Sequence, residues 1–132
     1  ADQLYEDTDY AKVSMIILPG GMPGAKNLKN HAGLRKQILE FNEKGKLLAA
    51  ICAAPLVFGN LGILKNKTAT CFPGFENELT GAKVTNNSVE SDGNIITGRG
   101  AGVALQFSLK IIEILKGKQE GRALAERMVV EK

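Results

Sequence analysis

Apolar runs alternate along this chain with segments whose apolar residues follow helical spacing. Strand-like runs lie at residues 13–18, 46–52 and 65–71, and two more flank Asp92-Gly93, a dipeptide that suits a tight hairpin. Helices are predicted at residues 30–45, 53–64, 101–117 and 118–130. Strands that alternate with helices indicate an α/β fold, in which a mostly parallel sheet is covered on both faces.

Local signals mark the ends of the predicted helices. Asn30 is a candidate cap for the first helix, and Gly45 stops it. Pro55 falls in the first turn of the second helix, where its missing amide does no harm. Gly117 ends the third helix. Residues 72–87 are turn-rich and polar apart from their Phe and Leu residues.

Composition narrows the class of protein. The chain has 132 residues, 44% of them hydrophobic and 23% charged, which fits one domain over 1–132. A net charge of +3, with five Phe, two Tyr and no Trp, argues against nucleic-acid binding. No apolar run is long enough to span a membrane and no signal peptide is visible, so we expect a cytoplasmic protein. Two cysteines and one histidine argue against a disulfide scaffold and against structural zinc.

Cys52 lies where a predicted strand meets a predicted helix. A nucleophile on such a sharp turn needs small residues two positions before and after it, and Ala50 and Ala54 satisfy this. The amides at the start of the helix would favour the thiolate. The alternative is a small, buried core thiol. The local sequence leaves both interpretations open.

Two glycine-rich turns also follow predicted strands. The first contains Gly20, Gly21 and Gly24, whose amides could form an oxyanion hole beside a nucleophile or simply a tight turn. The second, at 98–102, departs from the dinucleotide-binding pattern G-x-G-x-x-G because its sixth position is Val103. We therefore expect no nucleotide cofactor.

Arg99 is either a cation near the sheet edge or an ordinary solvated arginine. His31 opens a predicted helix, so we interpret it as a surface or capping residue rather than as the partner of Cys52. Cys71 ends the next predicted strand and could lie near Cys52. A reversible disulfide becomes available if their Cβ atoms come within about 4.5 Å.

Four segments in this order closely resemble the ThiJ/PfpI superfamily, in the branch of the Parkinson-disease deglycase and its bacterial relatives. They are "IILPGGMPGAKNL", "LLAAICAAPLVFGNLGIL", "VESDGNIITGRGAG" and "ALQFSLKIIEIL". The resemblance implies a flavodoxin-like three-layer sandwich of the class I glutamine amidotransferase type, without a cofactor and usually homodimeric. It implies that Cys52 is the reactive cysteine and that the amides of Gly21 and Ala53 face the substrate oxyanion. Residues near the site would be Gly20, Cys71, Arg99 and Gly100.

The chain departs from the family pattern in three places. Ala53 stands where the peptidase-like branch has a histidine, and Cys71 stands where the deglycase branch often has one. The family normally begins with a strand-turn-helix unit that carries a glutamate near the cysteine. The chain begins after that unit, so we interpret it as a C-terminal portion and assign the glutamate to no residue. One strand edge would then be exposed.

The expected function is that of a cysteine-dependent enzyme of the glyoxalase or deglycase type, acting on reactive dicarbonyls or their adducts. The alternative is a non-enzymatic redox sensor or chaperone, in which Cys52 is oxidised. A peptidase or amidase has less support, because the chain offers no suitable histidine base.

Overall fold

The computed structural model describes residues 1–130 of the chain and contains six strands. They are β1 (Met15–Leu18), β2 (Leu47–Ile51), β3 (Thr68–Ala69), β4 (Lys83–Val84), β5 (Val89–Asp92) and β6 (Ile95–Gly98). Four of them form a sheet in the order β1-β2-β6-β5. The β1–β2 and β2–β6 pairs are parallel, whereas β5 and β6 form an antiparallel hairpin. β3 and β4 form a separate parallel pair.

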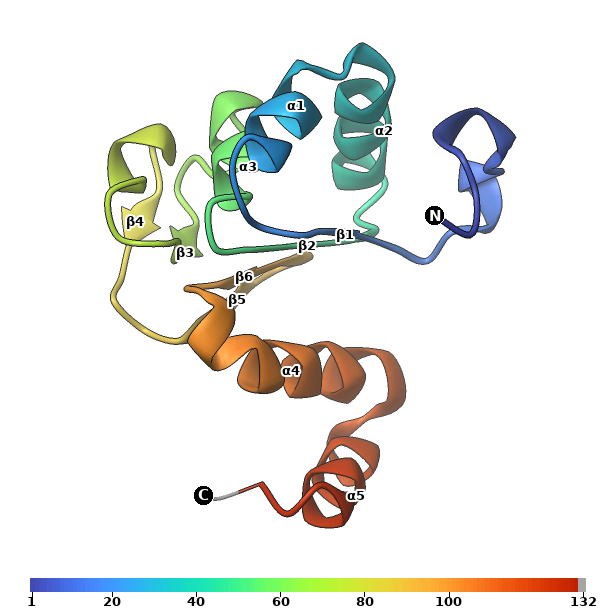
Figure 1. Cartoon of the computed structure of the whole chain (residues 1–132), viewed down its shortest axis with the longest axis vertical. Coiled ribbons are helices and arrows are strands. Elements are labelled where there is room, and N and C mark those ends of the chain that lie inside the picture. Colours follow the sequence, from blue (N-terminus) through green and yellow to red (C-terminus); the bar gives the residue numbers. More distant parts are fainter. Residues whose placement is uncertain (131–132) are drawn as a thin grey trace.

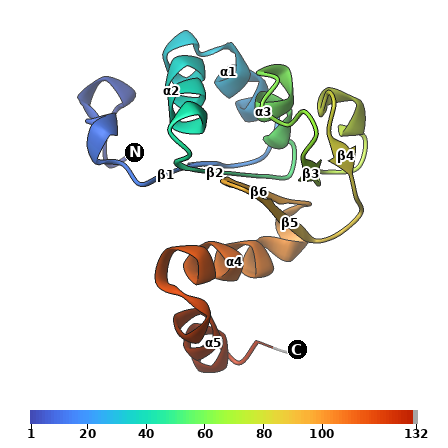
Figure 2. The ribbon, with the colours of Figure 1, turned by 180° about the vertical axis from the view of Figure 1, so that it is seen from behind.

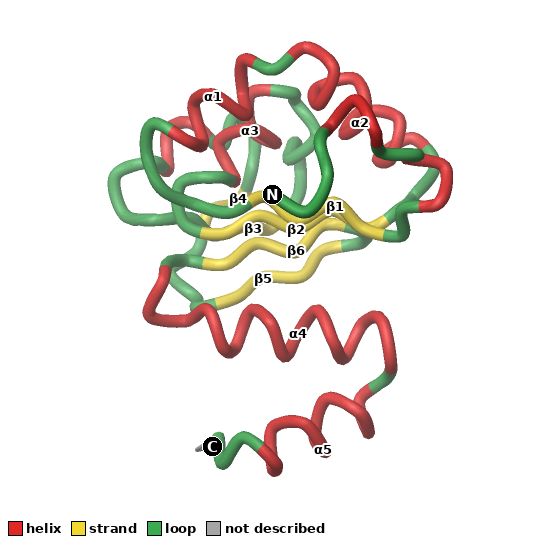
Figure 3. The backbone as a smooth tube through the Cα atoms, turned by 45° about the vertical axis from the view of Figure 1, so that its right-hand side comes forward, coloured by secondary structure: helices red, strands yellow, loops and turns green. Residues whose placement is uncertain are grey.

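Helices cover both faces of the main sheet. They are α1 (Gly24–Asn30), α2 (Ala32–Glu43), α3 (Pro55–Asn60), α4 (Ala104–Lys116) and α5 (Lys118–Arg127). Figure 1 shows α1, α2 and α3 on one side of the strands and α4 on the other, with α5 beyond α4. The same layers are seen from behind (Figure 2) and in the tube view (Figure 3). The predicted α/β sandwich with a mostly parallel sheet is confirmed.

The structure corrects the sequence predictions in several local details. Gly24, predicted to lie in a glycine turn, begins the helix α1. The cap of α2 is His31 rather than Asn30, because the Nδ1 atom of His31 accepts a hydrogen bond of 2.9 Å from the Leu34 amide. The segment predicted to be turn-rich contains β4. The single histidine of the chain is therefore a capping residue, one of the two roles expected for it.

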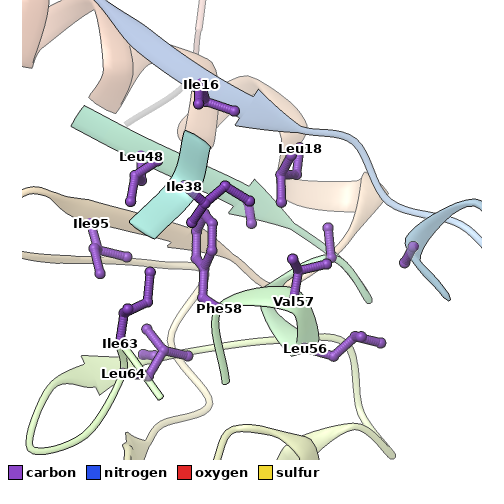
Figure 4. Close-up of a cluster of buried hydrophobic side chains, with 14 of the residues drawn as sticks. Ile16, Leu18, Ile38, Leu48, Leu56, Val57, Phe58, Ile63, Leu64 and Ile95 are labelled. Carbon is purple, nitrogen blue, oxygen red and sulfur yellow. The ribbon is translucent and has the colours of Figure 1, made fainter. Parts of the chain in front are cut away.

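The apolar side chains of the central strands alternate between the two faces of the sheet. Leu48 and Ile95 pack toward α1, α2 and α3, whereas their neighbours Ala49 and Ile96 pack toward α4. Figure 4 shows the larger cluster, where Ile38 and Phe58 lie together next to Leu48. Burial on both faces explains why these strands are continuous apolar runs in the sequence.

β1 forms one edge of the four-stranded sheet within the part of the chain that the structure describes. Its residue Ile17 is 49% exposed, whereas Ile16 and Leu18 on the opposite face are buried. No helix within residues 1–130 is both long enough and apolar enough to cross a membrane.

Ile38 and Leu39 are adjacent on α2 and provide a matched test of the core. Ile38 is fully buried, whereas Leu39 is 41% exposed. We expect Ile38→Ala to lower the free energy of unfolding by about 2–5 kcal/mol, because it removes buried methyl groups and leaves a cavity. Leu39→Ala should change it by less than about 1 kcal/mol. Urea denaturation measures both values, and equal losses would contradict the assigned orientation of α2.

Candidate functional site

Cys52 lies in the turn between β2 and α3, at the carboxyl edge of the sheet. Its φ angle is 65°, in the left-handed region that residues with a side chain rarely adopt. Such a conformation costs roughly 1–2 kcal/mol. Its side chain is partly buried. The strand-to-turn position predicted for Cys52 is therefore observed, and the chain turns sharply at the cysteine itself.

Two backbone hydrogen bonds hold the Cys52 residue from different segments. Its amide donates to the carbonyl of Gly98 at 2.9 Å, and its carbonyl accepts from the amide of Phe72 at 2.8 Å. Gly98 ends β6, and Phe72 follows Cys71 in the loop after β3. These bonds bring together three segments that are distant in the sequence.

The first glycine turn packs directly against Cys52. A Cβ atom placed on Gly20 would lie 2.4 Å from the Cβ atom of Cys52 and 3.3 Å from its sulfur. Only glycine fits there without displacing the cysteine. The next residue, Gly21, has a φ of +93° and open space at the position a Cβ would occupy.

Two amides in these turns are available to a ligand. Within residues 1–130, neither the Gly21 amide nor the Ala53 amide donates a hydrogen bond to another group of the protein. Ala53 is buried, where amides are normally paired, whereas Gly21 is exposed. Unpaired donors near a thiol are of the kind that binds a developing oxyanion. Ala53 directly follows Cys52, and Gly21 directly follows Gly20, the glycine that packs against Cys52. Their role as the oxyanion donors stays a prediction.

Cys71 is 2% exposed and carries a free thiol, as does Cys52. The pKa of the Cys71 thiol is raised to about 11, mainly by burial and also by the charges of Glu76 and Cys52, against a lowering effect of Arg99. Cys71 is therefore protonated at neutral pH. Cys71 lies near Cys52, as expected. The hydrogen bond from the next residue, Phe72, holds it there, and Cys71 is not part of the main sheet.

Arg99 and Gly100 follow β6 on the same side of the site. The Arg99 guanidinium donates a 3.2 Å hydrogen bond to the carbonyl of Asn86. A Cβ atom on Gly100 would touch the ring of Phe72 at 3.4 Å.

Phe72 is 45% exposed and lines a cleft of about 290 Å³ with Pro73 and residues 99–103. Sequence reasoning missed Phe72, whose only signal is an aromatic residue within a turn beside a cysteine.

Two buried threonines that the sequence did not single out fix the segment leading to Cys71. The Thr70 amide donates to Thr97 Oγ1 at 3.0 Å, and the Thr70 hydroxyl donates to the Thr85 carbonyl at 3.1 Å. Thr97 belongs to β6 and is 1% exposed. Its hydroxyl therefore joins the main sheet to the β3 segment. Nothing in an isolated strand sequence distinguishes such a threonine from any other β-branched residue.

His31 has another role, away from these contacts. It caps α2 and its ring packs edge-on against Tyr5, with the ring centroids 4.7 Å apart. Among residues 1–130, no group of three or more His, Cys, Asp or Glu side chains is arranged to hold a metal ion. The chemistry that the site itself offers is that of a thiol beside free amides.

A comparison with known families adds to this geometry. The sequence matches the DJ-1/PfpI family over residues 1–114. The chain belongs to the DJ-1/PfpI family. A crystal structure of DJ-1beta from Drosophila melanogaster superimposes with a TM-score of 0.87 at 33% identity, over 96% of this chain and 72% of that chain. The predicted ThiJ/PfpI resemblance and its fold are confirmed.

Two members of the DJ-1/PfpI family illustrate the range of similar proteins. Protein DJ-1 homolog B from Arabidopsis thaliana is 40% identical over 98% of this chain, which spans 30% of that protein's length. A protein from Caenorhabditis elegans named glutathione-independent glyoxalase DJR-1.2 is 30% identical over 99% of this chain and 70% of its own length. The cytoplasmic location expected from the sequence stays a prediction.

Gly20 and Gly24 provide a matched pair for testing the packing around Cys52. We expect Gly20→Ala to lower the free energy of unfolding by about 1–3 kcal/mol, because the added methyl group meets the Cβ atom of Cys52. The same methyl group should slow alkylation of Cys52 by iodoacetamide. Gly24→Ala has no atom within 4 Å of the new Cβ and lies at the start of α1, so it should raise stability by about 0.4–1 kcal/mol. Equal effects of the two substitutions would disprove the close approach at Gly20.

Proposed function

We propose that this chain carries the thiol chemistry of a cysteine-dependent enzyme of the glyoxalase or deglycase type. The Cys52 thiolate adds to the carbonyl carbon of a reactive dicarbonyl. A sulfur–carbon bond forms, and the π electrons of the carbonyl move to its oxygen. The amides of Gly21 and Ala53 stabilise the resulting oxyanion. The first adduct is a hemithioacetal.

One observation carries the proposal: Cys52 is held on a left-handed turn, and the amides of Gly21 and Ala53 in the adjoining turns have no other partner among residues 1–130. A packed core thiol needs neither a strained backbone nor free donors beside it. The name of the Caenorhabditis elegans relative supports a glyoxalase activity for the same family. The proposal assigns the proton transfers that complete the reaction to no residue of this chain.

The wider properties of the protein belong to the same proposal. The chain spans about 30% of the length of the Arabidopsis relatives it matches. Small carbonyl substrates and homodimer formation are therefore carried over from the family as proposals. The peptidase alternative has no support from the single histidine, because His31 is engaged as a helix cap.

The test compares the two cysteines in a methylglyoxal assay. Wild-type protein should convert methylglyoxal into lactate, and Cys52→Ala should reduce lactate formation to the uncatalysed background. Cys71→Ala is the matched control, and it should retain turnover because the Cys71 thiol is buried and protonated at neutral pH. Circular dichroism checks that both variants fold.

Undiminished turnover in Cys52→Ala would remove the proposed mechanism. If the wild-type protein instead converts no dicarbonyl and Cys52 is oxidised stoichiometrically by peroxide, the result would favour the redox-sensor alternative.

A further inference from the structure

The two cysteines of this chain lie at one backbone junction. The amide of Phe72 donates to the carbonyl of Cys52 at 2.8 Å, and Cys71 directly precedes Phe72. Paired strands joined by such bonds lie about 5 Å apart. Disulfides join residues whose Cα atoms are about 4.4–6.8 Å apart. The hydrogen bond therefore holds the backbones of Cys52 and Cys71 next to each other, as a disulfide between them requires.

The two thiols also sense each other's charge. A negative charge on Cys52 raises the pKa of Cys71, and the positive charge of Arg99 acts on Cys71 in the opposite direction. The two thiols are therefore within electrostatic range of each other. Arg99, at the end of β6, lies close enough to favour a thiolate formed at Cys71.

The two cysteines differ in their access to solvent. Cys52 is partly exposed, whereas Cys71 is 2% exposed. An oxidant dissolved in water therefore reaches Cys52 first. Cys71 is shielded from that oxidant but lies next to Cys52, which reacts with it. A peroxide-driven disulfide reaction needs one accessible cysteine that reacts with the oxidant and a second cysteine that then attacks the first. Cys52 and Cys71 fit these two roles.

We propose that Cys52 and Cys71 form a reversible disulfide when the protein meets hydrogen peroxide. The Cys52 thiolate attacks the peroxide, so a sulfur–oxygen bond forms, the oxygen–oxygen bond breaks and one water leaves. The Cys71 sulfur then attacks the sulfur of the Cys52 sulfenic acid. The sulfur–sulfur bond forms, and hydroxide leaves with the Cys71 proton as a second water. Overall, two thiols and one peroxide give one disulfide and two waters.

The disulfide has a chemical consequence for Cys52. A sulfenic acid without a nearby thiol is oxidised further to sulfinic acid, which ordinary thiol reductants do not reverse. The disulfide stops the oxidation of Cys52 at a stage that thiol reductants reverse. While the disulfide lasts, the Cys52 sulfur is not free to react. The proposal does not depend on Cys52 turning over a carbonyl, so a mass measurement tests it separately from the activity assay.

The experiment treats the full 132-residue chain with one equivalent of hydrogen peroxide and measures its intact mass. Wild-type protein should lose about 2 Da, contain no free thiol, and recover its original mass with dithiothreitol. Cys71→Ser should instead gain one or two oxygen atoms at Cys52. Cys52→Ser should stay unmodified under the same conditions, because its remaining thiol is buried. Cys71→Ala provides a second variant in case the serine hydroxyl perturbs folding.

Three results would overturn the proposal. Wild-type protein could gain oxygen as fast as Cys71→Ser while Cys71 stays free to react with iodoacetamide after unfolding. The disulfide could appear only between two chains on a non-reducing gel. Peptide mapping could also find oxidation at Cys71 before Cys52.

Discussion

The left-handed backbone of Cys52 is the constraint on which the rest of the site depends. A φ of 65° is unfavourable for a cysteine, so the surrounding structure must hold it there. Hydrogen bonds to Gly98 and from Phe72 do so, on the amide and the carbonyl of the same residue. Gly20 leaves room for the Cβ atom that this conformation directs toward it. Without the turn, the chain would continue as a buried strand at Cys52, and the thiol would be part of that strand.

The segment that follows β3 takes part in the same constraint. The β3 segment reaches Cys52 through the Phe72 amide, and it is joined to β6 by the bond between the Thr70 amide and the Thr97 hydroxyl. β6 in turn supplies Gly98 to the Cys52 amide. A closed set of bonds thus links the cysteine turn, β6 and the loop that carries Cys71. Each bond is individually modest, and together they fix one geometry.

Sequence reasoning predicted the parts of this architecture that depend on local pattern. Apolar runs gave the buried strands, and helical spacing gave α2 and α4. Small residues around Cys52 indicated the turn, because a sharp strand-to-helix turn excludes larger ones. His31 was interpreted as a possible cap, although Asn30 is the residue that cap preferences favour. In the structure, the Nδ1 atom of His31 is the acceptor at this position.

The contacts between distant segments could not be predicted in this way. Neither Phe72 nor Thr97 carries a local signal that connects it to Cys52, since each makes its contact through tertiary pairing. α1 was missed because glycine and proline at its start are typical of turns. β4 was missed because two residues are too few to show an alternating pattern. In both cases the packing of the whole chain outweighs local preference.

The most direct test of the account compares the stabilities of Cys52→Gly and Cys52→Ala in urea. At an ordinary position, glycine is less stable than alanine by about 0.5–1 kcal/mol, because it loses more conformational freedom on folding. At a left-handed position, relief of roughly 1–2 kcal/mol outweighs that loss. The account therefore predicts that Cys52→Gly is the more stable variant, by about 0.5–1 kcal/mol. A more stable Cys52→Ala would contradict the left-handed turn from which the proposed chemistry of this thiol follows.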